Sequence, residues 1–323
     1  MSTCLLQPTI IQYNRTVIYF YYGENDLLRK RAVDELAATF ADKYGADAVS
    51  QINCSDIEPQ RLIAEIVNIN MFAPERLILL DSLDQNNNAW ALIGENIARV
   101  PNDTSLVISV TSPDKRTKTF KTLKTAARVR EFQPLKGHEL ADWARQELAS
   151  SGLEYTSTAV DELIGATGGD QWRLAMEVAK LRTLDQVVTP QLVRQYVEPS
   201  LEANAFMIFE QVISGRREAA LAELEKVASL EDPNKFMGLL ASQAFALAAV
   251  VHGAGQRDVA STLKIHPFQL SKMGEVARRM GDLEQQKERV KRIAALLAAT
   301  DAKIKLSRPT EAWALISIAI GKI

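Results

Sequence analysis

The residues of this chain with the clearest chemical meaning stand at a predicted turn between a strand and a helix. Val17–Tyr22 is a β-branched and aromatic run, and Gly23 ends it. Asn25 or Asp26 can cap the helix that follows. A phosphate-binding turn is longer, glycine-rich and ends in Gly-Lys-Ser/Thr, because backbone N–H groups must wrap the phosphates. Here a single glycine precedes Glu24 and Asp26, whose charges repel phosphates, so we interpret the stretch as a nucleotide-binding fold that has lost its nucleotide.

The cysteines and histidines do not form a reactive or metal-binding set. Cys4 and Cys54 lie far apart and lack CxxC spacing. The histidines are scattered along the chain as His138, His252 and His266. The pattern predicts neither a disulfide framework nor a zinc site, and a reducing cytoplasm fits it.

Length and charge limit the class of protein. At 323 residues the chain exceeds what one hydrophobic core usually serves, so two or three domains are expected. The formal net charge of −2 and the pI near 6.1 argue against a free-standing DNA-coating protein, which would be strongly basic. Any contact with nucleic acid must then be local. We find no export signal and no apolar span of about 18 residues, and expect a soluble, unexported protein.

The first part of the chain alternates between strand and helix patterns. The predicted strands are Val17–Tyr22, Ala48–Asn53, Arg76–Asp81, Ser105–Thr111 and Arg128–Phe132. The predicted helices are Asp26–Lys43, Pro59–Ile69, Asn88–Val100 and Thr117–Thr125. Such alternation predicts a parallel sheet that is covered on both faces. Asp81 stands where an ATPase of this fold carries its acidic residue, but without a phosphate loop we interpret it as a strand-end cap.

After Pro134 the strand signal disappears and the pattern becomes helical. Three short helices are predicted at Gly137–Ser151, Ser157–Ala166 and Asp170–Leu184. Further helices are predicted at Phe206–Ser214, Arg217–Ser229, Pro233–Ala254, Val259–Leu263, Pro267–Met280, Leu283–Leu306 and Thr310–Ile320. Gly238–Val251 is apolar nearly all round, which suits a helix inside a bundle or an oligomer collar.

This arrangement resembles the delta subunit family of the bacterial DNA polymerase III clamp loader. The matching segments are Tyr19-Phe20-Tyr21-Tyr22-Gly23-Glu24 with Leu27-Leu28, Met71-Phe72 before Arg76-Leu77, Pro113-Asp114-Lys115-Arg116 with Lys121, Glu177 with Lys180-Leu181, His266-Pro267-Phe268 with Ala277-Arg278-Arg279, and Asp301-Ala302-Lys303-Ile304-Lys305. Their order and spacing carry the resemblance, since no single segment is diagnostic. Sibling subunits carry a phosphate loop, a four-cysteine zinc module or a Ser-Arg-Cys arginine finger, and this sequence has none of these.

The resemblance implies an AAA+-like α/β domain with a degenerate phosphate loop at residues 1–136. It further implies a three-helix lid at residues 137–198 and an all-α collar for oligomerisation at residues 199–323. Such a subunit has no catalytic site of its own and needs no cofactor, but it belongs to the DNA polymerase III holoenzyme, a DNA-directed DNA polymerase as an assembly. Its implied partners are the sliding clamp (the beta subunit), the other loader subunits in a hetero-pentamer, and primer–template DNA. A cytoplasmic, nucleoid-associated location without a membrane is expected.

The stretch Asn68-Ile69-Asn70-Met71-Phe72 resembles the short motif by which loaders and polymerases bind the clamp. Ile69, Met71 and Phe72 are therefore the candidate clamp-binding residues. Burying Met71 and Phe72 in a partner would contribute about 1.5–3 kcal/mol each before ordering costs. The alternative is that both are ordinary core residues that close the helix onto the next strand.

The densest positive run of the α/β domain supplies candidate DNA contacts. These are Lys115, Arg116, Lys118 and Lys121, followed by Lys124, Arg128 and Arg130. Lys115, Lys118 and Lys121 recur every three residues, which predicts one helix side that could follow a phosphate backbone. The alternatives are a solvated helix face or a contact with acidic neighbouring subunits.

Two other functions compete with the loader assignment. An ATPase or switch protein with an unusual nucleotide site is disfavoured by the missing lysine. A nucleic-acid-binding regulator would need a recognition helix with base-reading residues, and the sequence offers neither clearly.

Overall fold

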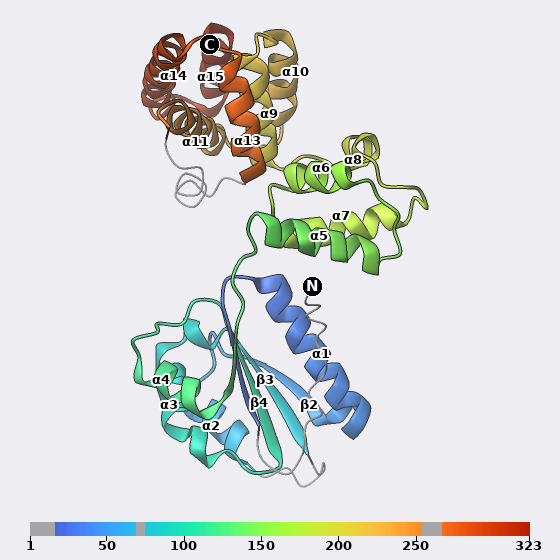
Figure 1. The fold of residues 1–323 in the computed structure, drawn as a ribbon. Helices are drawn as coiled ribbons and strands as arrows, with labels where there is room; N and C mark the ends of the chain where they lie inside the picture. The colour runs from blue at the N-terminus through green and yellow to red at the C-terminus, as the bar shows by residue number, and fades with distance from the viewer. Residues whose placement is uncertain (1–16, 69–74, 254–266) are drawn as a thin grey trace. The chain divides into compact units, whose positions relative to one another are not determined.

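The structure is a computed structural model that describes residues 17–68, 75–253 and 267–323. It divides into two compact units, Met1–Leu135 and Lys136–Ile323, which are described separately (Figure 1). The first unit is built on a sheet and the second is helical.

The first unit contains a five-stranded parallel sheet in the order β2-β3-β4-β1-β5. Its strands are β1 (Ile18–Tyr22), β2 (Val49–Asn53), β3 (Arg76–Asp81), β4 (Thr104–Val110) and β5 (Arg128–Glu131). The predicted strands are confirmed, with every end within about one residue, because buried parallel strands are continuous apolar runs. β5 differs from the rest, since it forms one edge of the sheet and all its residues are exposed.

Helices cover both faces of this sheet, as predicted (Figure 1). They are α1 (Asp26–Tyr44), α2 (Pro59–Val67), α3 (Asn87–Asn96) and α4 (Lys118–Ala126), with 3-10 turns η1 (Ala46–Ala48), η2 (Leu83–Gln85) and η3 (Ile97–Arg99). On one face, Phe20 of β1 packs with Trp90 of α3 and Phe120 of α4. On the other face, Phe40 of α1 packs against strand residues. The helix predicted at Asn88–Val100 is in fact α3 followed by η3.

The second unit begins with α5 (His138–Ser150), α6 (Ser157–Thr167), α7 (Gln171–Arg182) and α8 (Pro190–Tyr196). The first three helices were predicted, but α8 was missed. Thr189 caps α8 by accepting a hydrogen bond from the backbone N–H of Leu192 at 3.2 Å. Arg194 of α8 forms an ion pair with Glu162 of α6 at 3.1 Å. The predicted three-helix lid therefore contains a fourth helix.

The remaining described helices form a bundle. They are α9 (Leu201–Ile213), α10 (Arg217–Ala228), α11 (Pro233–Val251), α13 (Pro267–Arg278), α14 (Leu283–Ile304) and α15 (Pro309–Lys322). α9 begins five residues before its predicted start at Phe206, because the Ser200 hydroxyl caps it by accepting from the N–H of Ala203. The helix predicted at Val259–Leu263 lies outside the described residues.

Helix α11 lies in the core of this bundle along one side only. Phe236, Leu240 and Leu247 are buried, whereas Phe245 is 69% exposed. By length and composition alone, α11 could also cross a membrane, so the prediction that no stretch passes that test was wrong. Its buried contacts with α9, α14 and α15 are those of a core helix in a bundle.

Gly23 generates the first stability prediction. It has a φ of 130°, and a Cβ atom there would lie 2.2 Å from the carbonyl oxygen of Phe132. Gly23→Ala should lower the free energy of unfolding by more than about 2 kcal/mol, since strained backbone and a clash add together. Gly152→Ala is the matched control, because Gly152 also has positive φ but faces open space. If chemical denaturation gives the same loss in free energy of unfolding for both variants, the close approach of residue 23 to the Phe132 carbonyl is contradicted.

Candidate functional site

The turn after β1 is closed by the protein's own groups. The N–H of Gly23 donates to the carbonyl of Val110 at 3.2 Å, and the N–H of Asn25 donates to the carbonyl of Phe132 at 3.0 Å. The Asn25 side chain caps α1 by accepting from the N–H of Leu28 at 3.2 Å, and it donates to the carbonyl of Gln133 at 3.1 Å. Donors that would wrap phosphates in an ATPase are therefore engaged by β4 and the chain after β5.

The side chain of Arg29 fills the region next to this turn. It is buried, with 8% exposure, and reaches from α1 to the carboxyl end of β4. Its guanidinium donates to the hydroxyl of Ser109, to the hydroxyl of Thr111 at 2.9 Å, and forms an ion pair with Asp26. The Arg29 guanidinium thus lies at the carboxyl end of β4, beside the turn after β1, and Asp26 pairs with its charge.

Other reactive side chains near this edge of the sheet have structural roles. The Asp81 carboxylate accepts from the N–H of Ser82 at 2.9 Å, which confirms the predicted strand-end cap. Ser82 has a left-handed backbone with a φ of 57°. Burial raises the pKa of the Cys54 thiol to about 12, so this cysteine is no nucleophile at neutral pH. The described residues hold no His/Cys/Asp/Glu group that fits a metal ion.

The predicted clamp-binding residues Ile69, Met71 and Phe72 lie outside the described residues. The structure describes both flanks of their segment. On one side α2 ends at Val67 with Asn68 as its C-cap, and on the other side β3 begins at Arg76.

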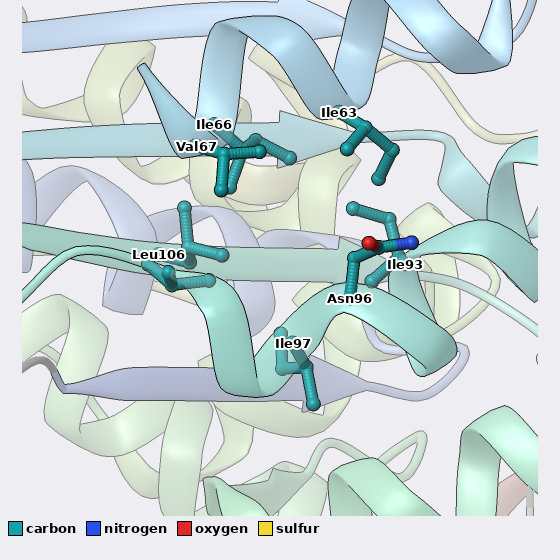
Figure 2. A pocket seen from close by; sticks show the side chains of 8 residues that line it. Ile63, Ile66, Val67, Ile93, Asn96, Ile97 and Leu106 are labelled. Carbon is teal, nitrogen blue, oxygen red and sulfur yellow. The ribbon is translucent and has the colours of Figure 1, made fainter. Parts of the chain in front are cut away.

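A small apolar hollow lies beside the end of α2 (Figure 2). It is lined by Ile63, Ile66, Val67, Ile93, Asn96, Ile97, Val100 and Leu106. It encloses no space for even a water-sized molecule, whereas ligand pockets usually span roughly 300–1,000 Å³ and carry several convergent polar groups. The amide of Asn96, the single polar side chain in this lining, already donates to the carbonyl of Leu92 at 2.9 Å. The hollow does not fit a cofactor.

Two of the four predicted DNA-contact residues are paired within the chain. Lys115 contacts Glu131 at 2.9 Å, and its ammonium lies 5.3 Å from the ring centroid of Tyr22. Arg116 forms a two-pronged contact with Asp114 at 3.0 and 2.9 Å. The hydrogen bond from Lys115 holds the pKa of Glu131 below its usual range, and Arg116 lowers the pKa of Asp114 to about 2.

Lys118 and Lys121 differ from these two residues. Both are exposed on α4, and neither forms an ion pair in the part of the chain that the structure describes. The prediction that Lys115 shares their helix side was wrong, because α4 begins at Lys118. The Thr117 hydroxyl caps the helix there by accepting from the N–H of Phe120 at 3.3 Å.

The arginines of β5 point to the other face of the sheet. Arg128 and Arg130 are aligned with Tyr19 and Tyr21, on the face that α1 covers. The Arg128 guanidinium lies 5.8 Å from the ring centroid of Tyr19. The positive run is therefore divided: Lys118, Lys121 and Lys124 lie on α4, whereas Arg128 and Arg130 lie on the opposite side of the sheet.

Sequence reasoning missed the two buried or bridging arginines, Arg29 and Arg76. Each stands in a pattern that an exposed arginine would also fit. For Arg29, the signal was present but weak: Asp26 lies one helical turn before it, and Ser109 and Thr111 are polar residues at the end of an apolar strand.

Two family models match the chain. The model "DNA polymerase III, delta subunit" matches residues 19–133, and "DNA polymerase III delta subunit, C-terminal domain" matches residues 202–319. A relative, DNA polymerase III subunit delta of Bacillus subtilis, is 24% identical, and the match covers 90% of this chain and 88% of the relative.

Solved structures were also compared with the chain, and one of them shares its fold. The Bacillus subtilis DNA clamp loader delta protein matches with a TM-score of 0.57 and 21% identity over 94% of each chain. A mutant of Thermotoga maritima RuvB has a TM-score of 0.39 and 14% identity over 82% of this chain and 80% of that one. The likeness to the delta protein supports the observed fold, a parallel-sheet α/β unit followed by helices. Because one family model covers the sheet unit and the other covers the C-terminal bundle, this chain belongs to the family of DNA polymerase III delta subunits.

Proposed function

We propose that this chain is a non-catalytic clamp-loader subunit that binds the sliding clamp and stabilises its opened ring for loading onto primed DNA. Family membership supports the assignment to the loader. The single observation that carries the non-catalytic part is the closed turn after β1, where Arg29 and backbone partners occupy the nucleotide region. A protein that binds the open ring better than the closed ring shifts that equilibrium by its difference in affinity.

The proposed anchor is the segment with Ile69, Met71 and Phe72. Its function needs two neighbouring large apolar side chains that enter a hydrophobic pocket of the clamp. The residues that flank the segment are Asn68 at the end of α2 and Arg76 at the start of β3, where the parallel strands begin. The closed turn belongs to the opposite ends of the strands.

The rest of the proposed assembly uses other parts of the chain. We propose a lid at residues 137–198 and a collar at residues 199–323 that joins sibling subunits in a hetero-pentamer. Exposed Phe245 on α11 is an apolar contact that fits a collar role. The subunit works in the cytoplasm at the nucleoid, without a membrane or cofactor.

The proposed DNA contacts centre on Lys118 and Lys121, whose charges no carboxylate of the described residues neutralises. Lys115 and Arg116 stand beside them but already contact Glu131 and Asp114. Phosphate contacts of this kind position a protein on DNA without reading its sequence.

Truncating the two large apolar side chains tests the proposed anchor. Met71→Ala with Phe72→Ala should abolish clamp binding in surface plasmon resonance, while the melting temperature stays nearly unchanged. A matched control is Leu230→Ala with Leu306→Ala, which truncates two exposed leucines of the second unit. If the anchor double variant unfolds, its side chains were core residues and the assignment fails.

Charge reversal tests the DNA surface. Lys118→Glu with Lys121→Glu should weaken binding of the assembled loader to primed DNA and reduce the slope of log K against log salt, since phosphate contacts release counterions. Lys30→Glu on α1, which lies across the sheet, is the control. Equal DNA affinity of the double variant and the unmodified loader would remove α4 from the interface.

Ligand addition separates the proposal from the alternative of an ATPase or switch protein with an atypical site. A ligand that binds the folded state raises its stability by mass action. Mg²⁺ with ATP should therefore leave the melting temperature of the purified chain unchanged, and a sibling subunit with a phosphate loop serves as positive control. A concentration-dependent rise, or ATP hydrolysis by the pure chain, would establish the alternative.

A further inference from the structure

The side chain of Arg76 connects the end of α2 to the start of β3. Its Nη2 group donates to the carbonyl of Ile66 at 2.9 Å and to the carbonyl of Asn68 at 2.5 Å. Its Nε donates to the hydroxyl of Thr104 on β4 at 2.8 Å. The backbone N–H of Arg76 also donates to the carbonyl of Asp103 at 2.8 Å. One residue thereby ties a helix end to two neighbouring strands.

These contacts suit the end of a helix. The last carbonyls of a helix have no partner within it, and they carry the negative end of the helix dipole. A guanidinium supplies several donors in a fixed planar fork, together with a positive charge, which a lysine does not reproduce. The Thr104 hydroxyl is itself oriented, since it donates to the Asp103 carboxylate at 3.0 Å. We call the hydrogen bonds of Arg76 to Ile66, Asn68 and Thr104 the Arg76 bridge. The oriented Thr104 hydroxyl holds this bridge from the side of β4.

The bridge bounds the segment proposed as the clamp anchor. Asn68 is the last described residue before that segment, and Arg76 is the first residue of β3 after it. Because Arg76 binds the carbonyl of Asn68 directly, the two ends of the segment are held beside each other. Fixing both ends reduces the number of conformations that a binding segment can lose when it docks.

We propose that Arg76 is a positioning residue for clamp binding: it fixes the direction in which the chain leaves α2 and returns to β3, and so presents the anchor. The inference rests on the proposed function of Met71 and Phe72. Arg76 itself touches no residue of the clamp. It acts through the carbonyls of Ile66 and Asn68.

Two substitutions at Arg76 test this role. Arg76→Lys keeps the charge but loses the fork, and Arg76→Gln loses both. Each should weaken clamp affinity on the order of tenfold, as expected when charge-assisted hydrogen bonds are removed. Arg61→Lys is the matched control, because Arg61 is an exposed arginine of the same helix α2 and takes no part in the hydrogen bonds of Arg76. Its clamp affinity should stay near that of the unmodified chain.

Amide hydrogen exchange of the isolated chain provides a readout that does not involve the clamp. The N–H of Asn68 donates to the carbonyl of Ala64 at 3.0 Å in the last turn of α2. This amide should exchange faster in Arg76→Lys and Arg76→Gln, while amides of β4 stay protected. A general rise in exchange would instead mean a stability effect and would overturn the positioning role.

The outcomes separate the two proposals. If Met71→Ala with Phe72→Ala leaves clamp binding intact, the anchor assignment fails, and with it the positioning role. If that variant loses binding but Arg76→Lys keeps full affinity and full protection of the Asn68 amide, the positioning role alone fails. If Arg76→Gln does not fold, Arg76→Lys and the Arg61→Lys control still decide the question.

Discussion

The hydrogen bonds of Arg29 hold together the part of the sheet unit that a nucleotide would hold in an ATPase of this fold. They join the first turn of α1 to the carboxyl end of β4, and Asp26 compensates the buried charge. A buried cation without an anionic partner lowers the stability of the folded protein. Removing one member of a buried ion pair is therefore more destabilising than replacing both members by apolar residues. The turn after β1 can therefore stay short, because no phosphate needs to be surrounded.

The carboxyl ends and the amino ends of the parallel strands then have different roles. At the carboxyl ends, hydrogen bonds of Gly23 and Arg29 close the turn after β1. At the amino ends, Arg76 joins α2 to β3 and Thr104, next to the proposed anchor segment. An arginine that joins separate elements stands at each of these two ends of the strands. Under the proposed function, a subunit built this way would leave the timing of clamp opening to ATP-binding siblings.

Much of this fold could be predicted because its signals are local and repeated. The apolar runs of β1, β3 and β4 and the turn residues between elements predicted the sheet and its helical cover. Short elements were harder: α8 is seven residues long, and its start depends on Thr189 and Pro190. The predicted helix Thr117–Thr125 agrees with α4 to within one residue, but the three-residue spacing of the lysines wrongly suggested that Lys115, which precedes the cap residue Thr117, shares its charged side. The roles of Arg29 and Arg76 needed the tertiary structure, since Ser109, Thr111 and Thr104 lie far from them in sequence.

The short edge strand β5 has a consequence for the behaviour of the free subunit. An unpaired strand edge can recruit another chain and seed aggregation. β5 limits this hazard in three ways: it has four residues, it carries Arg128 and Arg130 on one face, and it ends at Glu131, which Lys115 engages. The short length of β5 and its charged side chains thus disfavour pairing of this sheet edge with another chain.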